Sequence, residues 1–155
     1  MRRGVAGSGS GRPYWRRYRL LLDTNVLLDA LEPARPQSQE ACRVLELCNG
    51  EGDMGFACVL SLKDVYYVMQ RFHGETVARQ AVDRLAGLVT IAPVSWEECE
   101  MSLHGDEPDF EDGLVRACAE LNDIDFILTR DSAAFAHSPV RSVTCAEYLE
   151  IVRER

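Results

Sequence analysis

Four aspartates stand at positions where their carboxylates could meet. Asp23 ends the apolar run "LLLD", and Asp131 ends "ILTRD", so each closes a predicted strand. Asp64 in "SLKDV" and Asp112 in "PDFEDGL" fall near the predicted starts of two helices. Carboxylates that are packed together repel one another unless a proton or a cation lies between them, and Mg²⁺ and Mn²⁺ prefer oxygen ligands. The pattern therefore indicates a site for a divalent cation held by carboxylate oxygens.

Each helix-start acid also has an ordinary structural explanation. Asp109 and Asp112 are spaced i, i+3 in a first helical turn, where carboxylates cap free N–H groups and complement the helix dipole. We expect Asp109 to be the cap and Asp112, which lies deeper in the helix, to be the ligand. Asp64 could instead complete a capping box with Ser61. The order of the four acids along the chain favours one shared site over separate coincidences, because ligands bind at the carboxyl edge of a parallel sheet.

The elements that would carry these acids alternate between strands and helices. The apolar runs and turn signals predict strands over 18–23, 54–60, 88–94, 125–131 and 140–144. Apolar residues at helical spacing predict helices over 37–50, 61–74, 75–87, 95–103, 109–122 and 145–154. The predicted strands are almost wholly apolar, as in parallel sheets that are covered on both faces. The fold class is therefore α/β, with a central parallel sheet flanked by helices.

Length and charge limit the kind of protein further. The chain has 155 residues, enough for one domain with a sizeable core, and we expect residues 17–155 to form it. Residues 1–16 read as a flexible basic leader or the remnant of an expression tag. Six of the 17 basic residues precede the first acid, whereas the remainder of the chain carries all 25 acidic residues, which argues against broad nucleic-acid binding. No apolar run suits a signal peptide or a membrane span, so we expect a soluble, cytoplasmic protein.

Cysteine and histidine offer no second chemistry. The six cysteines are scattered, mostly within apolar stretches, and form no C-x-x-C pair, so we expect buried free thiols. The three histidines are also dispersed and match no metal-binding spacing. No side-chain nucleophile is therefore evident.

The stretches "LLLDTNVLLDAL", "LSLKDVYYVM", "PDFEDGLVRACAEL" and "FILTRD" resemble the four acidic motifs of PIN-domain nucleases. This family includes the VapC-type toxins of bacterial toxin–antitoxin pairs, and the resemblance runs from about Tyr18 to the C-terminus. It implies a PIN-like domain and a Mg²⁺- or Mn²⁺-dependent endoribonuclease. By position, Asp23, Asp64, Asp112 and Asp131 match the catalytic acids. Asp23, Asp112 and Asp131 would bind the metal directly.

Other residues match or depart from the family pattern. Asn25, Thr129 and Asp109 match supporting residues of the motifs. The second acid is more usually glutamate, and Asp64 is one methylene shorter. Gly113 stands in place of the more usual alanine, which costs a helix about 1 kcal/mol, and the sequence shows no gain that offsets this cost.

The resemblance also implies partners: an RNA substrate, a cognate antitoxin protein and a second copy in a homodimer. On an acidic protein, Arg130 and Arg71 are candidates for RNA contacts, although such arginines are often simply solvated. Tyr66 and Tyr67 are adjacent on one predicted helix and cannot both face inward, so part of that helix could meet a partner.

Three other readings stay open at this point. A PIN-like protein that no longer cleaves could act by binding RNA or a protein. A haloacid-dehalogenase-like phosphatase would have a second Asp two residues after the first, where this chain has Asn25. A receiver domain would have a lysine late in its sheet, but the only lysine is Lys63, on a predicted helix. The last two are therefore disfavoured.

Overall fold

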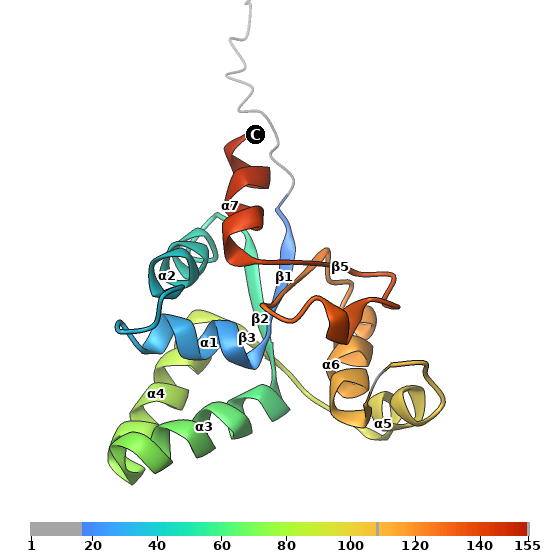
Figure 1. The fold of residues 1–155 in the computed structure, drawn as a ribbon, viewed down its shortest axis with the longest axis horizontal. Coiled ribbons are helices and arrows are strands. Elements are labelled where there is room, and N and C mark those ends of the chain that lie inside the picture. The colour runs from blue at the N-terminus through green and yellow to red at the C-terminus, as the bar shows by residue number, and fades with distance from the viewer. Residues whose placement is uncertain (1–16, 108, 155) are drawn as a thin grey trace, which may run out of the picture.

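Five short strands lie side by side at the centre of the computed structural model, which describes residues 17–107 and 109–154 (Figure 1). They are β1 (Arg19–Leu22), β2 (Met54–Cys58), β3 (Thr90–Ala92), β4 (Phe126–Leu128) and β5 (Arg141–Val143). All four neighbouring pairs are parallel, in the order β3-β2-β1-β4-β5. The predicted α/β class with a parallel sheet is confirmed. The predicted leader, residues 1–16, lies outside the described residues.

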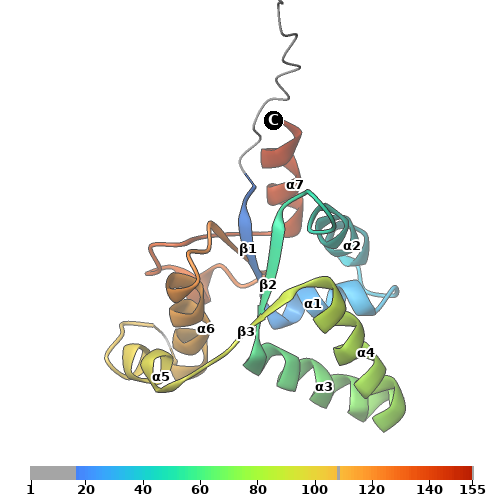
Figure 2. The same cartoon turned by 180° about the vertical axis from the view of Figure 1, so that it is seen from behind.

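Helices cover both faces of this sheet. They are α1 (Thr24–Leu31), α2 (Ser38–Leu47), α3 (Val59–His73), α4 (Glu75–Leu88), α5 (Trp96–Leu103), α6 (Phe110–Leu121), α7 (Cys145–Arg153) and the short 3-10 helix η1 (Ala133–Phe135). Figure 1 and Figure 2 show α1 to α4 on one side of the strands and α5 and α6 on the other. Strand β1 serves both layers, because Leu20 and Leu22 pack into the core on the first side and Leu21 into the core on the second. Among the described helices none has the length and apolar character of a membrane span.

The differences from the sequence-based expectation that bear on the acids lie at α3 and α1. The strand predicted over 54–60 ends at Cys58, and α3 begins at Val59 rather than after Ser61. Ser61 is buried inside the helix and does not cap it. The capping explanation for Asp64 is therefore wrong. No element is predicted over 24–31, where α1 forms because Asp23 caps it, its carboxylate accepting from the Thr24 amide at 2.8 Å.

The amino end of the sheet is held by a buried aromatic and acidic cluster. Asp53, which is 2% exposed, accepts hydrogen bonds from the Tyr148 hydroxyl on α7 and from the Tyr18 amide. The rings of Tyr18, Phe126 and Tyr148 meet edge to face. Helix α7 is thus tied to the start of β1, at the end of the sheet opposite Asp23 and Asp131.

All six cysteines lie within the described residues and all are free, as predicted. Cys58, Cys118 and Cys145 are buried, whereas the other three are only partly so.

Candidate active site

The four predicted acids line one cavity at the carboxyl edge of the sheet. Asp23 directly follows β1, and Asp131 follows β4, the strand that pairs with β1. Asp64 comes from α3, the helix after β2, and Asp112 from the first turn of α6. The cavity has a volume of about 490 Å³. Its position is the point where strand order reverses around β1, which is where open α/β sheets bind ligands.

Asp23 is the most tightly held of the four carboxylates. One oxygen accepts from the Thr24 amide at 2.8 Å, and the other accepts from the Thr129 hydroxyl at 2.8 Å and the Asn25 side-chain amide at 3.3 Å. Burial raises the pKa of Asp23 above its usual value, and the charges of Asp131 and Asp64 add to the rise. The hydrogen bonds from Thr129 and Thr24 oppose it. These hydrogen bonds fix the direction of the carboxylate, and no Lys, Arg or His of the described residues forms an ion pair with it.

Asp112 lies in an acidic environment. Its amide donates to the Asp109 carboxylate at 2.8 Å, so Asp109 caps α6, as predicted. Burial and then the nearby Asp109 carboxylate raise the pKa of Asp112 from 3.8 to about 6, and the charges of Asp23 and Asp131 contribute to the same rise. Carboxylates from β1, α6 and the segment after β4 thus lie within electrostatic reach of one another.

Thr129 joins two of the acids. Its side chain is 1% exposed, and its hydroxyl donates to Asp23 Oδ2 while accepting from the Asp131 amide at 3.0 Å. Asp131 Oδ1 in turn accepts from the Ala134 amide at the start of η1. One buried hydroxyl therefore sets the relative positions of the ends of β1 and β4.

Asp29 anchors the segment that carries Asp131, a role that is not predicted from the sequence. It is a 1% exposed acid on α1, and its carboxylate pairs with Arg130 Nε at 2.9 Å and with Arg35 Nη1 at 3.4 Å. The Arg130 amide also donates to Asn25 Oδ1 at 3.2 Å. Arg130 is predicted to contact RNA, but its guanidinium forms an ion pair with the buried Asp29 carboxylate. The available signal was an acid inside the apolar run "NVLLDAL".

The wall formed by α3 carries Asp64 beside a cation. Lys63 Nζ lies 3.1 Å from Asp64 Oδ1, and both side chains are well exposed. Of the described residues that line the cavity, Lys63 is the one cation. Ser61, Phe110 and Glu111 also line it, and sequence reasoning named none of them as site residues. Arg71, the other predicted RNA contact, does not line the cavity and lies two turns further along α3.

Gly113 has a packing reason that the sequence did not reveal. A Cβ at this position would lie 2.1 Å from Ser102 Oγ and 2.9 Å from Ser102 Cβ. The Ser102 hydroxyl donates to the Phe110 carbonyl at 2.8 Å, which fastens α5 to the first turn of α6. The expectation that Gly113 brings only a cost is wrong, because the missing side chain lets α5 approach the turn that carries Asp112.

The donor set fits a hard divalent cation. All four acids offer oxygen atoms, and the raised pKa values of Asp23 and Asp112 reflect burial and mutual repulsion that a cation would relieve. Across residues 17–107 and 109–154, however, no three Asp, Glu, His or Cys side chains already have the geometry of a metal site. The carboxylates share a cavity without forming a closed coordination shell.

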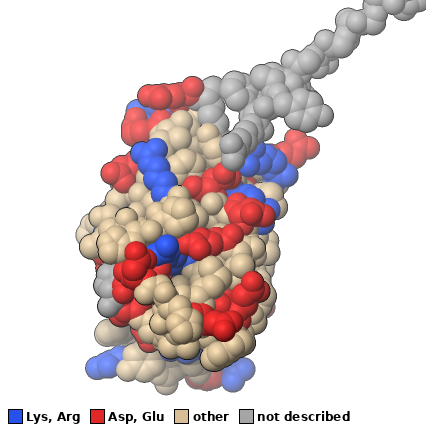
Figure 3. All heavy atoms as spheres, turned by 90° about the vertical axis from the view of Figure 1, so that its right-hand side faces the viewer, with Lys and Arg blue, Asp and Glu red and all other residues tan. Residues whose placement is uncertain are grey.

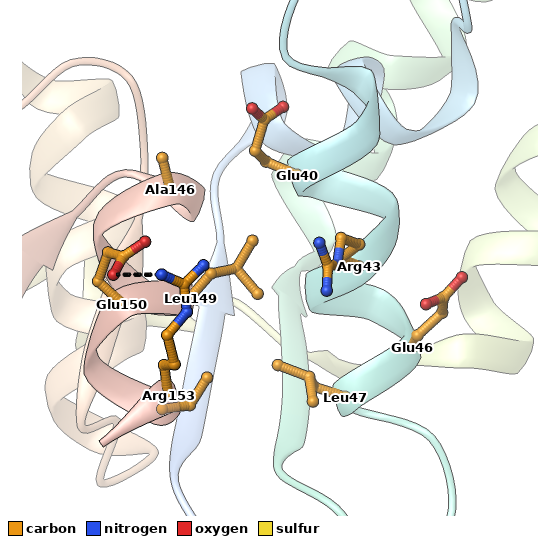
Figure 4. A pocket seen from close by; sticks show the side chains of 9 residues that line it. Glu40, Arg43, Glu46, Leu47, Ala146, Leu149, Glu150 and Arg153 are labelled. Atoms are coloured by element: carbon orange, nitrogen blue, oxygen red, sulfur yellow. Dashed lines mark hydrogen bonds and ion pairs between the residues drawn. The ribbon is translucent and has the colours of Figure 1, made fainter. Parts of the chain in front are cut away.

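A second hollow, of about 540 Å³, lies between α2 and α7 (Figure 4). Leu149 of α7 and Leu47 of α2 both point into it, and Arg153 pairs with Glu150 at 3.1 Å on its α7 side. None of the four predicted acids lines it. Figure 3 shows the face with α5 and α6, where acidic side chains are spread widely and basic ones are scattered among them. The acid-lined cavity is therefore the candidate active site.

Solved structures of other proteins share the fold of this chain. A toxin–antitoxin complex from Klebsiella pneumoniae has a chain with a TM-score of 0.62 and 25% identity, the match covering 81% of this chain and 97% of that one. Mycobacterium tuberculosis VapC20, a toxin that cleaves the sarcin–ricin loop, matches with a TM-score of 0.61 at 17% identity, over 76% of this chain and 93% of its own. DNA-bound VapBC from Salmonella typhimurium matches with a TM-score of 0.63 at 11% identity, over 83% of this chain and 98% of that one.

No curated protein matches this chain in sequence. The sequence profile of the PIN domain matches residues 19–133, a span that contains all four acids of the cavity. With that match over most of its length, the chain belongs to the PIN-domain family.

Proposed function

We propose that this PIN-domain protein is a Mg²⁺- or Mn²⁺-dependent endoribonuclease and the toxin component of a toxin–antitoxin pair. The observation that carries the proposal is the convergence of four carboxylates from four separate elements on one cavity at the carboxyl edge of the sheet. The similarity to chains from toxin–antitoxin complexes supports the toxin role and an antitoxin as partner. A homodimer is part of the same proposal.

In this proposal Asp23, Asp112 and Asp131 hold the ion, and Asp64 is the fourth acid of the site. A bound divalent ion would lower the pKa of a water ligand and neutralise charge that develops on the phosphate. The protein's own contribution is position. Thr129 and the Thr24 amide hold the Asp23 carboxylate, and Thr129 also holds the Asp131 backbone. Asn25 steadies both segments, donating to Asp23 Oδ2 and accepting from the Arg130 amide.

The test is cleavage of single-stranded RNA by the purified protein with Mn²⁺ and then with EDTA. We expect Asp23→Asn and Asp112→Asn to abolish metal-dependent cleavage and to keep the far-ultraviolet circular dichroism of the wild type, because each change removes a negative charge without removing volume. Undiminished cleavage by both variants would remove the site assignment.

The alternative is a PIN-like protein that binds RNA or a protein without cleaving. One observation favours it: among the described residues, no three candidate ligands have a ready metal-binding geometry. The same experiment separates the two functions. Wild-type protein that binds RNA and leaves it intact with Mn²⁺ supports the alternative.

A further inference from the structure

An exposed stripe of three side chains runs along α3 away from the cavity. Lys63, Tyr67 and Arg71 are spaced i, i+4 and i+8, so they lie along one side of the helix. The Lys63 side chain is 70% exposed and lines the cavity. Tyr67 is 60% exposed, and Arg71 is exposed in the last turn. We call these three residues the α3 stripe.

The α3 stripe carries two positive charges beside an acidic cavity. The cavity rim is acidic, and a polyanion that approaches it needs nearby cations to offset repulsion. Arg116 and Arg130 cannot serve well, because neighbouring carboxylates already pair with them. Arg71 has no ion-pair partner among the residues that the structure describes. Among the described residues, Lys63 forms an ion pair only with Asp64, at an exposed position where water screens the pair.

The middle of the stripe is the exposed aromatic ring of Tyr67. Arg71 Nη1 donates to the Tyr67 hydroxyl at 3.5 Å, so the guanidinium lies near the hydroxyl end of this ring. Basic groups interleaved with an exposed aromatic ring are the elements that bind single-stranded nucleic acid: the cations contact phosphates and the ring stacks on a base. On α6, across the cavity, Phe110 is 44% exposed and offers a second ring.

We propose that the α3 stripe binds single-stranded RNA and leads it to the acidic cavity, with Lys63 and Arg71 contacting phosphates and Tyr67 stacking on a base between them. The rise from Lys63 to Arg71 is about 12 Å, so the stripe holds a short stretch of extended strand. The part of this inference in which the RNA is led to the cavity rests on the proposed function. Binding itself does not depend on cleavage.

The first test measures binding without chemistry. The full-length protein is titrated against a labelled oligouridine in EDTA, and affinity is followed by fluorescence anisotropy at several salt concentrations. We expect Tyr67→Ala to weaken binding by about tenfold and Tyr67→Phe, which keeps the ring, to change it little. Arg71→Gln removes one phosphate contact, so the slope of log K against log salt becomes shallower by about 0.7.

The matched controls are an exposed aromatic residue and an exposed arginine that lie outside the α3 stripe. Trp96 on α5 is 68% exposed, and Arg84 on α4 is exposed, but neither lines the cavity. Trp96→Ala and Arg84→Gln should leave both the affinity and the salt slope as in the wild type. With Mn²⁺ and cleavable RNA, Tyr67→Ala should raise KM and leave kcat unchanged, because the stripe binds substrate away from the reacting atoms.

The outcomes separate this inference from the proposed function. Wild type that binds oligouridine without cleaving RNA, with binding lost in the stripe variants, supports the stripe and overturns the nuclease. Wild type that cleaves, with unchanged affinity, salt slope and KM in the stripe variants, overturns the stripe and keeps the nuclease. If the variants instead turn a dimer into a monomer and bind RNA as before, the face is an interface between copies and the RNA assignment is wrong.

Discussion

At the scale of single residues, the site is defined by unbalanced negative charge. Asp112 shows this most clearly, because burial and the charges of Asp109, Asp23 and Asp131 raise its pKa from 3.8 to about 6. A carboxyl whose pKa is higher in the folded than in the unfolded protein destabilises the fold as the pH rises through that interval. The metal-free protein therefore carries a strain that its acidic site creates.

This gives a prediction about stability. In EDTA, Asp112→Asn should increase the free energy of unfolding at pH values well above 6, where wild-type Asp112 is charged, and the gain should vanish below 3.8, where the carboxyl is protonated in both states. Urea unfolding across this pH range measures it. A gain that stays constant over the whole range would mean that the charge of Asp112 is not the cause.

At the scale of elements, the end of β4 depends on α1. The segment 129–131 is fastened by the Asp29–Arg130 ion pair, by the Arg130 amide on Asn25, and by the Thr129 hydroxyl on Asp23. All three partners lie on α1 or at its cap. Helix α1 therefore both covers the sheet and fastens the segment that leads to Asp131.

Arg130→Gln tests this anchor. We expect it to cost about 1–3 kcal/mol of stability, because buried Asp29 loses its closest partner, and to lower kcat with little change in KM, since Asp131 would shift. Arg35→Gln is the matched control: it removes the longer contact to Asp29, at 3.4 Å, and leaves Arg130 in place, so kcat should persist. A higher KM at unchanged kcat for Arg130→Gln would instead support the RNA contact that the sequence predicts.

At the scale of the whole molecule, the two ends of the sheet carry different groups of residues. The acids gather at the carboxyl end, whereas Tyr18, Asp53 and Tyr148 bind α7 to the sheet at the amino end. Figure 1 shows α7 beside the start of β1, away from the α3 and α6 elements that carry Asp64 and Asp112. We therefore expect substitutions at the amino end of the sheet to change stability and to leave the proposed RNA cleavage unchanged.

Tyr148→Phe should show this separation. The buried Asp53 carboxylate would lose a hydrogen bond from the Tyr148 hydroxyl, at a cost of about 1.5–3 kcal/mol, while the aromatic packing stays. Thermal unfolding should move to lower temperature, and RNA cleavage at a temperature where the variant is folded should match the wild type. Loss of cleavage in the folded variant would show that the two ends are coupled.

The sequence by itself determined the parallel α/β architecture, the capping role of Asp109 and the candidate acids. These depend on local patterns: apolar runs, helical spacing, and acids at the ends of elements. The sequence does not show where α3 begins, because "MGFACVL" is apolar throughout and gives no signal for where the strand ends and the helix starts. Helix α1 is not predicted for a similar reason: its eight residues follow closely on the apolar strand β1 and give no clear signal that separates the two elements.

Only the tertiary structure decided what each residue faces. Arg130 looked free in the sequence and is occupied by Asp29, a residue 101 positions away. Gly113 looked like a defect and makes room for Ser102. The spacing of residues along a chain indicates which side of its own helix or strand a residue lies on. Contacts between elements depend on how whole helices and strands pack against one another. That packing is determined jointly by residues that are distant in the sequence.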